Sequence, residues 1–294
     1  MTGPRLLFGA GGTGGHLIPA LAVARALRLA CPEVDILFAG VGRPAEAELL
    51  DPEGWPRVVL AGQGFKGGSF KSKVGSLKSA FVGLGQALKL IRSFKPRLFF
   101  GAGGYVTGPV GLAAWLNFKP VVIHEQNSRP GLTNRLLAKV AKEIFVGFPE
   151  GLEAFSPDKA VLTGNPLRTE IAALFERKLN YNVRDRFVLL IMGGSQGANR
   201  LNVAALDLVA QLAEAGLDFE VIHQTGAKDE AKIDSFYSRL GIKRETKAFF
   251  KDPERLYQKA HLAITRAGAL TVTELAAVGL PAILVPLPTA ADDH

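Results

Sequence analysis

The sequence has few of the features that mark secreted or membrane-spanning proteins. Its 294 residues include a single cysteine, Cys31, so no disulfide can form within the chain, which fits a reducing compartment. No apolar run approaches the ~20 residues that a transmembrane helix needs. The first residues do not combine a basic segment with an apolar stretch, as a secretory signal would. We therefore expect neither a membrane span nor export.

The sequence also has fewer acidic than basic residues. The 35 lysines and arginines outnumber 27 aspartates and glutamates, which gives a formal net charge of +8 and favours anionic partners. The sequence lacks the Cys/His spacing of zinc modules and the interleaved aromatic and basic residues of RNA-binding modules, so we expect no nucleic-acid partner. No Asp-x-Asp pair follows a predicted strand, so we expect no metal ion to hold a diphosphate.

What the sequence does contain, near its start, is the glycine-rich stretch Gly9-Ala-Gly-Gly-Thr-Gly-Gly-His16. It lies between an apolar run and an amphipathic run, which predicts a strand, a tight turn and a helix with Pro19 in its first turn. Bare backbone N–H groups and the positive end of a helix bind anions. A turn without a ligand is the alternative, but it does not explain the titratable His16 at the mouth of the loop.

The same glycines have the G-x-G-x-x-G spacing of dinucleotide sites. Such a site needs an acidic residue at the end of the second strand, to bind the adenine ribose. That strand, residues 35–39, ends in Ala39-Gly40 and carries Asp35 at its other end. Arg43 is weak support for a 2′-phosphate, so a nicotinamide cofactor is disfavoured.

Predicted strands alternate with helices along the whole chain, which indicates parallel sheets. The Pro- and Gly-bearing stretch 148–166 is a candidate junction, after which the pattern begins again. We therefore predict an α/β protein of two doubly wound, Rossmann-like domains, residues 1–163 and 164–294, that face each other across a cleft. The predicted strands are residues 6–8, 35–39, 97–100, 121–124, 144–146, 161–163, 187–192, 219–223, those around 264, and 282–285.

Two further segments leave alternatives open. In the predicted helix 77–91, an apolar stripe flanked by lysines fits either a core-facing surface or a patch on an anionic membrane. The loop Thr265–Glu274 opens a helix whose first turn is expected to carry Thr271, Thr273 and Glu274. The Glu274 carboxylate is suited to both hydroxyls of a ribose, or it only complements the helix dipole. Arg168 is suited to a diphosphate or to a surface ion pair.

Taken together, six motifs resemble the MurG family, the UDP-N-acetylglucosamine:lipid I N-acetylglucosaminyltransferases of glycosyltransferase family 28. Each motif alone is weak, but the six occur in the family's order along the whole chain. They are Gly11-Gly-Thr-Gly-Gly-His16-x-x-Pro19, Gly103-Gly-Tyr-Val-Thr-Gly-Pro109, His124-Glu-Gln-Asn127, Gly164-Asn-Pro-x-Arg168, Gly193-Gly-Ser-Gln-Gly-Ala198 and Arg266-x-Gly-Ala-Leu-Thr-Val-Thr-Glu274.

The resemblance implies a GT-B fold and an inverting transfer that needs neither metal nor cofactor. The donor is UDP-N-acetylglucosamine, and the acceptor is the C4 hydroxyl of the muramyl unit of lipid I, undecaprenyl-pyrophosphoryl-MurNAc-pentapeptide. The product is lipid II, made for peptidoglycan at the cytoplasmic face of the bacterial membrane, where the enzyme is peripheral.

The resemblance also implies three groups of site residues. The donor-binding residues are Thr13, Gly14, Gly15, Asn127, Arg168, Ser195, Phe250 beside the uracil, Ala269, Leu270, Thr271, Val272, Thr273 and, at the ribose, Glu274. The acceptor pyrophosphate is held by Gly12, Gly14, Gly15, Gly103, Gly104 and Tyr105. The membrane patch consists of Leu77, Phe81, Leu84, Trp115, Lys71, Lys73 and Lys78.

The transfer needs a base for the acceptor hydroxyl, and His16 is the candidate because histidine has a pKa of about 6.5. The alternative is that His16 orients the acceptor or a phosphate, and Glu125 is the reserve candidate. Members of the family continue beyond the counterpart of His294 with a glutamine that contacts the sugar. We therefore expect a fragment, with weak or absent transferase activity and poor stability if the chain ends there. A UDP-N-acetylglucosamine 2-epimerase and a nucleotide-sugar-binding protein without turnover are the alternative functions.

Overall fold

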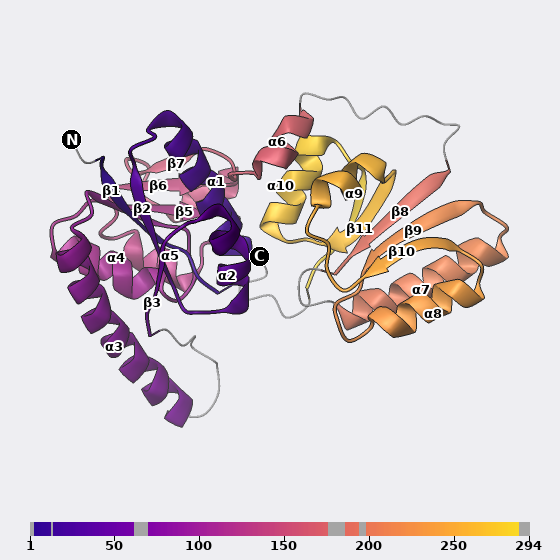
Figure 1. The fold of residues 1–294 in the computed structure, drawn as a ribbon, viewed down its shortest axis with the longest axis horizontal. Helices are drawn as coiled ribbons and strands as arrows, with labels where there is room; N and C mark the ends of the chain where they lie inside the picture. The colour runs from indigo at the N-terminus through magenta and orange to yellow at the C-terminus, as the bar shows by residue number, and fades with distance from the viewer. Residues whose placement is uncertain (1–2, 13, 62–69, 176–185, 194–197, 288–294) are drawn as a thin grey trace. The chain divides into compact units, whose positions relative to one another are not determined.

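The structure, a computed structural model, describes residues 3–12, 14–61, 70–175, 186–193 and 198–287, and of residues 70–80 it describes the backbone alone. The chain divides into two compact units, Met1–Arg168 (unit 1) and Thr169–Asp293 (unit 2) (Figure 1). Each unit has its own sheet and its own apolar core.

The described residues of unit 1 form a seven-stranded parallel sheet in the order β3-β2-β1-β4-β5-β6-β7. The chain first adds strands on one side of β1 and then returns to build the other side from β4. At such a reversal the loops that follow the two central strands diverge and leave a crevice for ligands. The strands are β1 (Arg5–Gly9), β2 (Asp35–Gly40), β3 (Arg57–Val59), β4 (Leu98–Gly101), β5 (Val121–Glu125), β6 (Glu143–Val146) and β7 (Ala160–Leu162).

Helices cover both faces of this sheet. Successive side chains of a strand point to opposite faces, so Leu7 enters the core beneath α3, α4 and α5, and Phe8 the core beneath α1 and α2. Burial on both faces explains why the strands are continuous apolar runs. The helices are α1 (Gly14–Ala30), α2 (Pro44–Leu50), α3 (Phe70–Phe94), α4 (Thr107–Leu116) and α5 (Leu132–Leu137), with short 3-10 helices at Asp51–Glu53 and Pro149–Ala154.

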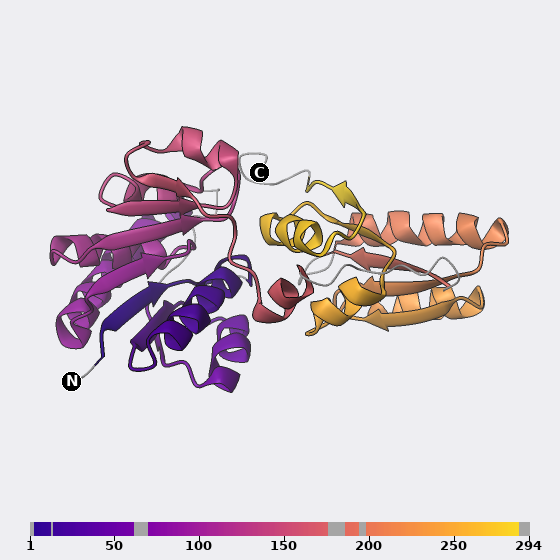
Figure 2. The ribbon, with the colours of Figure 1, turned by 90° about the horizontal axis from the view of Figure 1, so that it is seen from above.

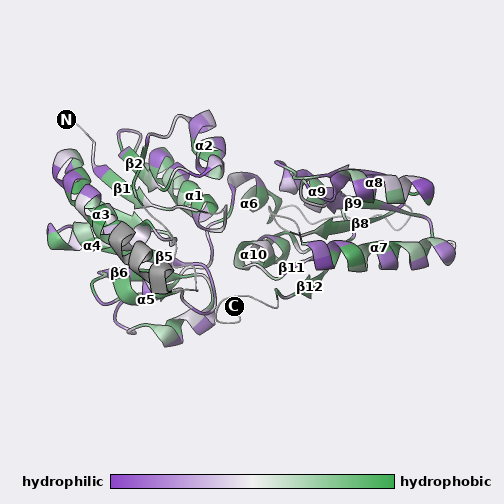
Figure 3. Ribbon diagram, turned by 90° about the horizontal axis from the view of Figure 1, so that it is seen from below, coloured by the Kyte–Doolittle hydropathy of each residue, from purple (hydrophilic) through white to green (hydrophobic). Residues whose placement is uncertain are grey.

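Unit 2 repeats the plan with five described parallel strands in the order β10-β9-β8-β11-β12, which reverses between β8 and β11. Helices α7 and α8 lie on one face and α6, α9 and α10 pack on the other (Figures 1 and 2). Figure 3 shows mainly apolar strands and helices with a polar outer side. The elements are α6 (Thr169–Phe175), β8 (Phe187–Met192), α7 (Asn199–Glu214), β9 (Phe219–Gln224), α8 (Glu230–Arg239), β10 (Lys243–Lys247), α9 (Pro253–Lys259), β11 (Leu262–Arg266), α10 (Ala269–Val278) and β12 (Ala282–Val285).

The two parallel α/β sheets expected from the sequence are confirmed, but two details are wrong. Pro19 does not lie in the first turn of α1, because the helix already begins at Gly14. It lies in the second turn, where it cannot donate a hydrogen bond to the Gly15 carbonyl. The candidate junction 148–166 contains strand β7, which pairs with β6 in the sheet of unit 1. The division between the units falls after Arg168.

Candidate active site

Two glycine loops of unit 1 meet where the strand order reverses. The first follows β1 and the second follows β4, and the two strands are parallel neighbours with Gly9 opposite Gly101. The buried Thr107 hydroxyl at the start of α4 lies 2.9 Å from the Gly9 carbonyl oxygen and 2.6 Å from that of Gly103. One side chain therefore joins the two loops.

Glycine at two positions lets the loops approach each other closely. A Cβ on Gly104, whose φ is +85°, would collide with the Gly11 carbonyl oxygen. A Cβ on Gly103, whose φ is +95°, would lie 2.7 Å from Cδ2 of His16. The imidazole of His16 therefore lies against the bare backbone of the second loop. The structure thus brings His16 together with two of the residues expected at the acceptor pyrophosphate.

The first loop leads directly into α1, which begins at Gly14. The N–H groups of the first turn of a helix have no acceptor within the helix, and this end of the helix dipole is positive. Gly14 and Gly15 therefore present backbone donors suited to a phosphate oxygen. Thr13, also expected at this site, lies outside the described residues.

A buried carboxylate that the sequence analysis missed accepts hydrogen bonds from the backbone of the first loop and of the loop after β2. Glu46, on α2 and only 2% exposed, accepts the N–H of Gly12 at 3.2 Å and of Val41 at 3.0 Å on Oε1, and the N–H of Gly42 at 2.8 Å on Oε2. A Cβ on Gly40 would collide with this carboxylate. The Gly12 N–H therefore donates to Glu46, and the expected role of Gly12 at the acceptor pyrophosphate stays a prediction.

Glu125, the reserve candidate for the base, organises the loop after β5. Its Oε1 accepts the backbone N–H and the side-chain amide of Asn127, both at 3.0 Å. Its Oε2 accepts the Gly131 N–H at 3.1 Å and the Asn134 amide at 2.8 Å. Both oxygens are thus engaged by donors of the same loop. This arrangement argues against Glu125 as the base, and the expected contact of Asn127 with the donor stays a prediction.

Other buried polar residues at the end of β5 hold the last segment of unit 1. His124 lies 3.2 Å through Nε2 from the Gly164 carbonyl and 3.0 Å through Nδ1 from the Gln126 amide, and the Asn165 amide donates to the Gln126 carbonyl. Burial lowers the pKa of His124 to about 4. His124 is therefore neutral at pH 7 and donates from Nε2. These contacts fix the chain that leads to Arg168, the last residue of unit 1.

In unit 2, helix α10 carries the run expected to bind the donor. Gly268 precedes the helix and Ala269 begins it, so Glu274 is the sixth residue and lies in the second turn. The helix dipole acts mainly within the first turn, so the dipole account of Glu274 does not fit. Instead Glu274 is nearly buried and accepts a hydrogen bond from the Tyr257 hydroxyl at 2.8 Å. The Thr273 hydroxyl donates to the Ala269 carbonyl within the helix.

A second buried network ties α7 to β9. His223 lies 2.8 Å through Nδ1 from the Tyr237 hydroxyl and 3.2 Å through Nε2 from Oδ1 of Asn202. The Asn202 amide donates to the Thr225 carbonyl at 2.9 Å and to Asp229 at 2.8 Å. Burial lowers the pKa of His223 to about 4 and raises that of Tyr237. His223 is therefore neutral, and the network fixes Asn202 in the first turn of α7.

Phe250 and Ser195 are two further residues expected to bind the UDP-sugar donor. The Phe250 ring is only 3% exposed, with the Lys247 ammonium 5.3 Å and the Arg255 guanidinium carbon 5.9 Å from its centroid. The expected position of Phe250 beside the uracil stays a prediction. Ser195 lies outside the described residues.

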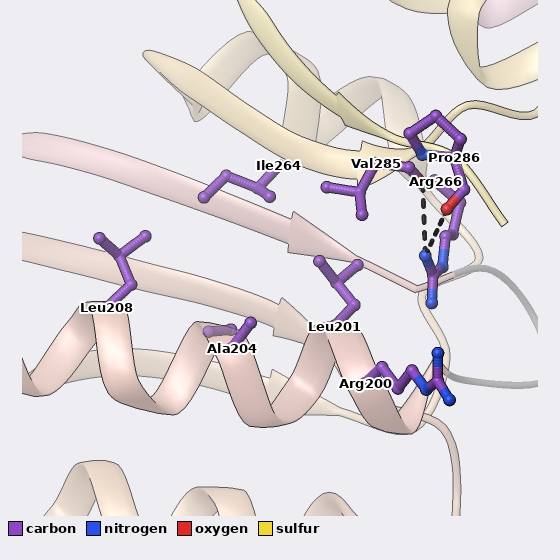
Figure 4. A pocket seen from close by; sticks show the side chains of 9 residues that line it. Arg200, Leu201, Ala204, Leu208, Ile264, Arg266, Val285 and Pro286 are labelled. Carbon is purple, nitrogen blue, oxygen red and sulfur yellow. Dashed lines mark hydrogen bonds between the residues drawn. The ribbon is translucent and has the colours of Figure 1, made fainter. Parts of the chain in front are cut away.

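A pocket of about 240 Å³ lies between α7 and strands β11 and β12. Figure 4 shows apolar side chains along most of it and two arginines, Arg200 and Arg266, at one end. Arg266 donates through Nη1 to the Pro286 carbonyl at 3.0 Å. Arg200 lies at the start of α7, and Arg266 is the last residue of β11. Both therefore add positive charge near the carboxyl ends of the strands of unit 2.

Comparison with known families covers both units. Residues 6–146 match the glycosyltransferase family 28 N-terminal domain, and residues 188–294 match the C-terminal domain of the same family. The chain belongs to glycosyltransferase family 28.

Relatives of this family 28 chain include curated MurG enzymes. It is 43% identical over 293 residues to the UDP-N-acetylglucosamine–N-acetylmuramyl-(pentapeptide) pyrophosphoryl-undecaprenol N-acetylglucosamine transferase of Desulfotalea psychrophila, a match over 99% of this chain and 78% of the relative. It is 41% identical over 291 residues to the enzyme of the same name from Coxiella burnetii, over 99% and 80% of the two chains. The resemblance inferred from the six motifs is confirmed.

Solved structures agree with the fold. The crystal structure of Acinetobacter baumannii MurG has a TM-score of 0.75 and 32% identity, over 98% of this chain and 80% of that one. A UDP-GlcNAc 2-epimerase from Neisseria meningitidis has a TM-score of 0.65 at 15% identity, over 95% and 82%. The second likeness concerns the fold alone. The GT-B class expected from the sequence is confirmed.

Proposed function

We propose that this chain transfers N-acetylglucosamine from UDP-N-acetylglucosamine to undecaprenyl-pyrophosphoryl-MurNAc-pentapeptide, the reaction for which its relatives are named. The C4 hydroxyl of the muramyl unit attacks the anomeric carbon of the donor while the bond to UDP breaks. The hydroxyl proton passes to a base, and UDP leaves with the bonding electrons. A single displacement of this kind inverts the anomeric carbon.

The observation that carries the proposal for unit 1 is the meeting of the two glycine loops around His16. The backbone donors of Gly14 and Gly15 at the start of α1 are suited to the acceptor pyrophosphate. Gly103 and Gly104 complete this surface. The imidazole of His16 at the same place is our candidate for the base, and neutral histidine accepts a proton near pH 7.

For unit 2 we propose that α10 binds the donor. The N–H groups of its first turn, from Ala269 to Thr271, are suited to a phosphate oxygen. Glu274, one turn further, accepts the ribose hydroxyls. Arg168 and Ser195 remain our candidates for the diphosphate. In this scheme helix ends and a guanidinium balance the charge of the leaving UDP.

Transfer of labelled N-acetylglucosamine to a lipid I analogue tests the proposal, with wild type compared with H16Q. We expect transfer by wild type, and in H16Q a loss of kcat of about 10²–10⁴-fold with UDP-donor binding retained. A near-normal kcat in H16Q removes the base role. Epimerisation of the donor without any lipid-linked product overturns the transferase assignment.

We also propose that unit 1 lies on an anionic membrane through α3, α4 and α5. Among the described residues no helix is long and apolar enough to span a bilayer. Phe81 on α3 is 67% exposed and Trp115 on α4 47%, and α4 packs against both α3 and α5. Leu84, expected in the patch, is partly buried and packs against the core. The side chains of Leu77, Lys71, Lys73 and Lys78 lie outside the described residues.

Further exposed apolar side chains lie on and beside these helices, and so do exposed cations. The apolar residues are Val82, Leu112, Leu116, Phe118, Leu132 and Leu136, and the exposed cations are Lys89, Arg92, Arg135 and Lys139. Apolar insertion and attraction of basic residues to anionic lipid act together at such a surface. Co-sedimentation with phosphatidylglycerol vesicles tests this proposal. We expect F81S/W115S to bind less than wild type, and equal binding overturns the assignment of the patch.

A further inference from the structure

Two buried side chains on different helices of unit 2 contact each other, and only one of them, Glu274, has a part in the proposed reaction. The Tyr257 hydroxyl on α9 donates to Oε2 of Glu274 on α10 at 2.8 Å. Tyr257 is 1% exposed and Glu274 is 7% exposed, so Glu274 is the outer member of the pair. The neighbouring Leu256 is fully buried, so α9 presents the phenol from a packed position.

We propose that Tyr257 is a positioning residue, which holds the Glu274 carboxylate in the orientation that binds the ribose hydroxyls of the donor. This inference rests on the proposed role of Glu274. A glutamate side chain has several rotatable bonds and loses conformational freedom when it is fixed by a ligand. A phenol anchored in the core fixes one carboxylate oxygen before the donor arrives. Less freedom is then lost on binding, and the donor binds more tightly.

A purely structural pair is the competing account, because a buried tyrosine hydroxyl needs an acceptor in any protein. The two accounts differ in one respect. A positioning role affects the KM only of those UDP-sugars that bind Glu274 through the ribose. A structural role affects the KM of every UDP-sugar equally. The 2′-deoxyribose analogue of UDP-N-acetylglucosamine lacks one of the two hydroxyls and therefore separates the accounts.

The test is Y257F, which removes the hydroxyl and retains the ring. We expect the KM of UDP-N-acetylglucosamine to rise by about three- to tenfold with a smaller change in kcat. The rise for the 2′-deoxy analogue should be clearly smaller. The matched control is Y237F, another buried tyrosine of unit 2, whose hydroxyl contacts His223. Any effect of Y237F should be equal for both donors. Equal effects of Y257F on both donors overturn the proposal.

The variant E274Q separates failure of this inference from failure of the proposed function. If Tyr257 acts through Glu274, Y257F adds little to the KM of E274Q, although the single change raises it in wild type. If E274Q raises the KM and Y257F leaves it unchanged, the ribose role stands and the positioning role fails. If E274Q leaves the KM unchanged, the ribose role of Glu274 fails, and the positioning role fails with it.

Discussion

Replacing Glu46 by glutamine tests whether one buried carboxylate shapes the loop that precedes His16. The carboxylate accepts three backbone N–H groups, from Gly12, Val41 and Gly42. Glutamine has nearly the same size, but one of its two terminal groups is a donor. E46Q therefore places an NH2 group against backbone N–H groups that need an acceptor.

The size of the effect follows from these contacts. A hydrogen bond to a charged group contributes ~1.5–3 kcal/mol, and a buried donor left without an acceptor costs ~1–3 kcal/mol. Glu46 is 2% exposed, so water cannot replace the lost acceptor. We expect E46Q to lower the free energy of unfolding of unit 1 by roughly 2–4 kcal/mol. For a unit of this size that corresponds to a fall in Tm of about 5–15 °C.

Tryptophan fluorescence during urea denaturation measures this change in unit 1 alone, because both tryptophans, Trp55 and Trp115, belong to it. The matched control is E48Q, an exposed glutamate on the same helix, which should change stability by less than ~0.5 kcal/mol. The reasoning is refuted if E46Q is no less stable than E48Q.

Three further predictions concern the second loop, the base and pH. G103A places a methyl group against His16 at a residue with positive φ, so kcat in the transfer assay should fall while donor binding persists; an unchanged kcat would contradict the assigned contact. E125Q should lower stability without removing a limb of the pH profile of kcat, and loss of that limb would restore Glu125 as a base. Burial lowers the pKa of His124 and of His223 to about 4, below the ~6.5 of an unfolded histidine. The unfolded chain therefore binds more protons in this window, and stability falls as pH drops from about 6.5 to 4, by at most ~1.4 kcal/mol per pH unit for each histidine. Tm measured across this range should show the fall, and a flat profile would contradict it.

The sequence predicted most of the fold because buried parallel strands are apolar on both faces. Runs such as Phe187–Met192 are apolar throughout, as expected of a strand buried on both faces. Strand β10, Lys-Arg-Glu-Thr-Lys, was missed because it is a polar strand at the edge of its sheet. Its hydrogen bonds to β9 depend on a partner that local composition does not reveal.

The site was harder to predict, because the decisive contacts join residues far apart in the chain. Nothing near Glu46 indicates that its carboxylate reaches Gly12, 34 residues away. A carboxylate at the end of a strand, as at Glu125, looks catalytic from sequence. In the structure, N–H groups of the following loop donate hydrogen bonds to both oxygens of this carboxylate. Only the three-dimensional path of that loop shows this.

The hydrogen bonds around His223 all run in one direction. Tyr237 gives its proton to Nδ1, Nε2 gives its proton to Asn202, and the amide gives its protons to Thr225 and Asp229. A single amide thus decides which tautomer the imidazole adopts. An aspartate at position 202 would keep an acceptor for Nε2 but would lose both donors and set a second carboxylate against Asp229, so this position of α7 requires an amide.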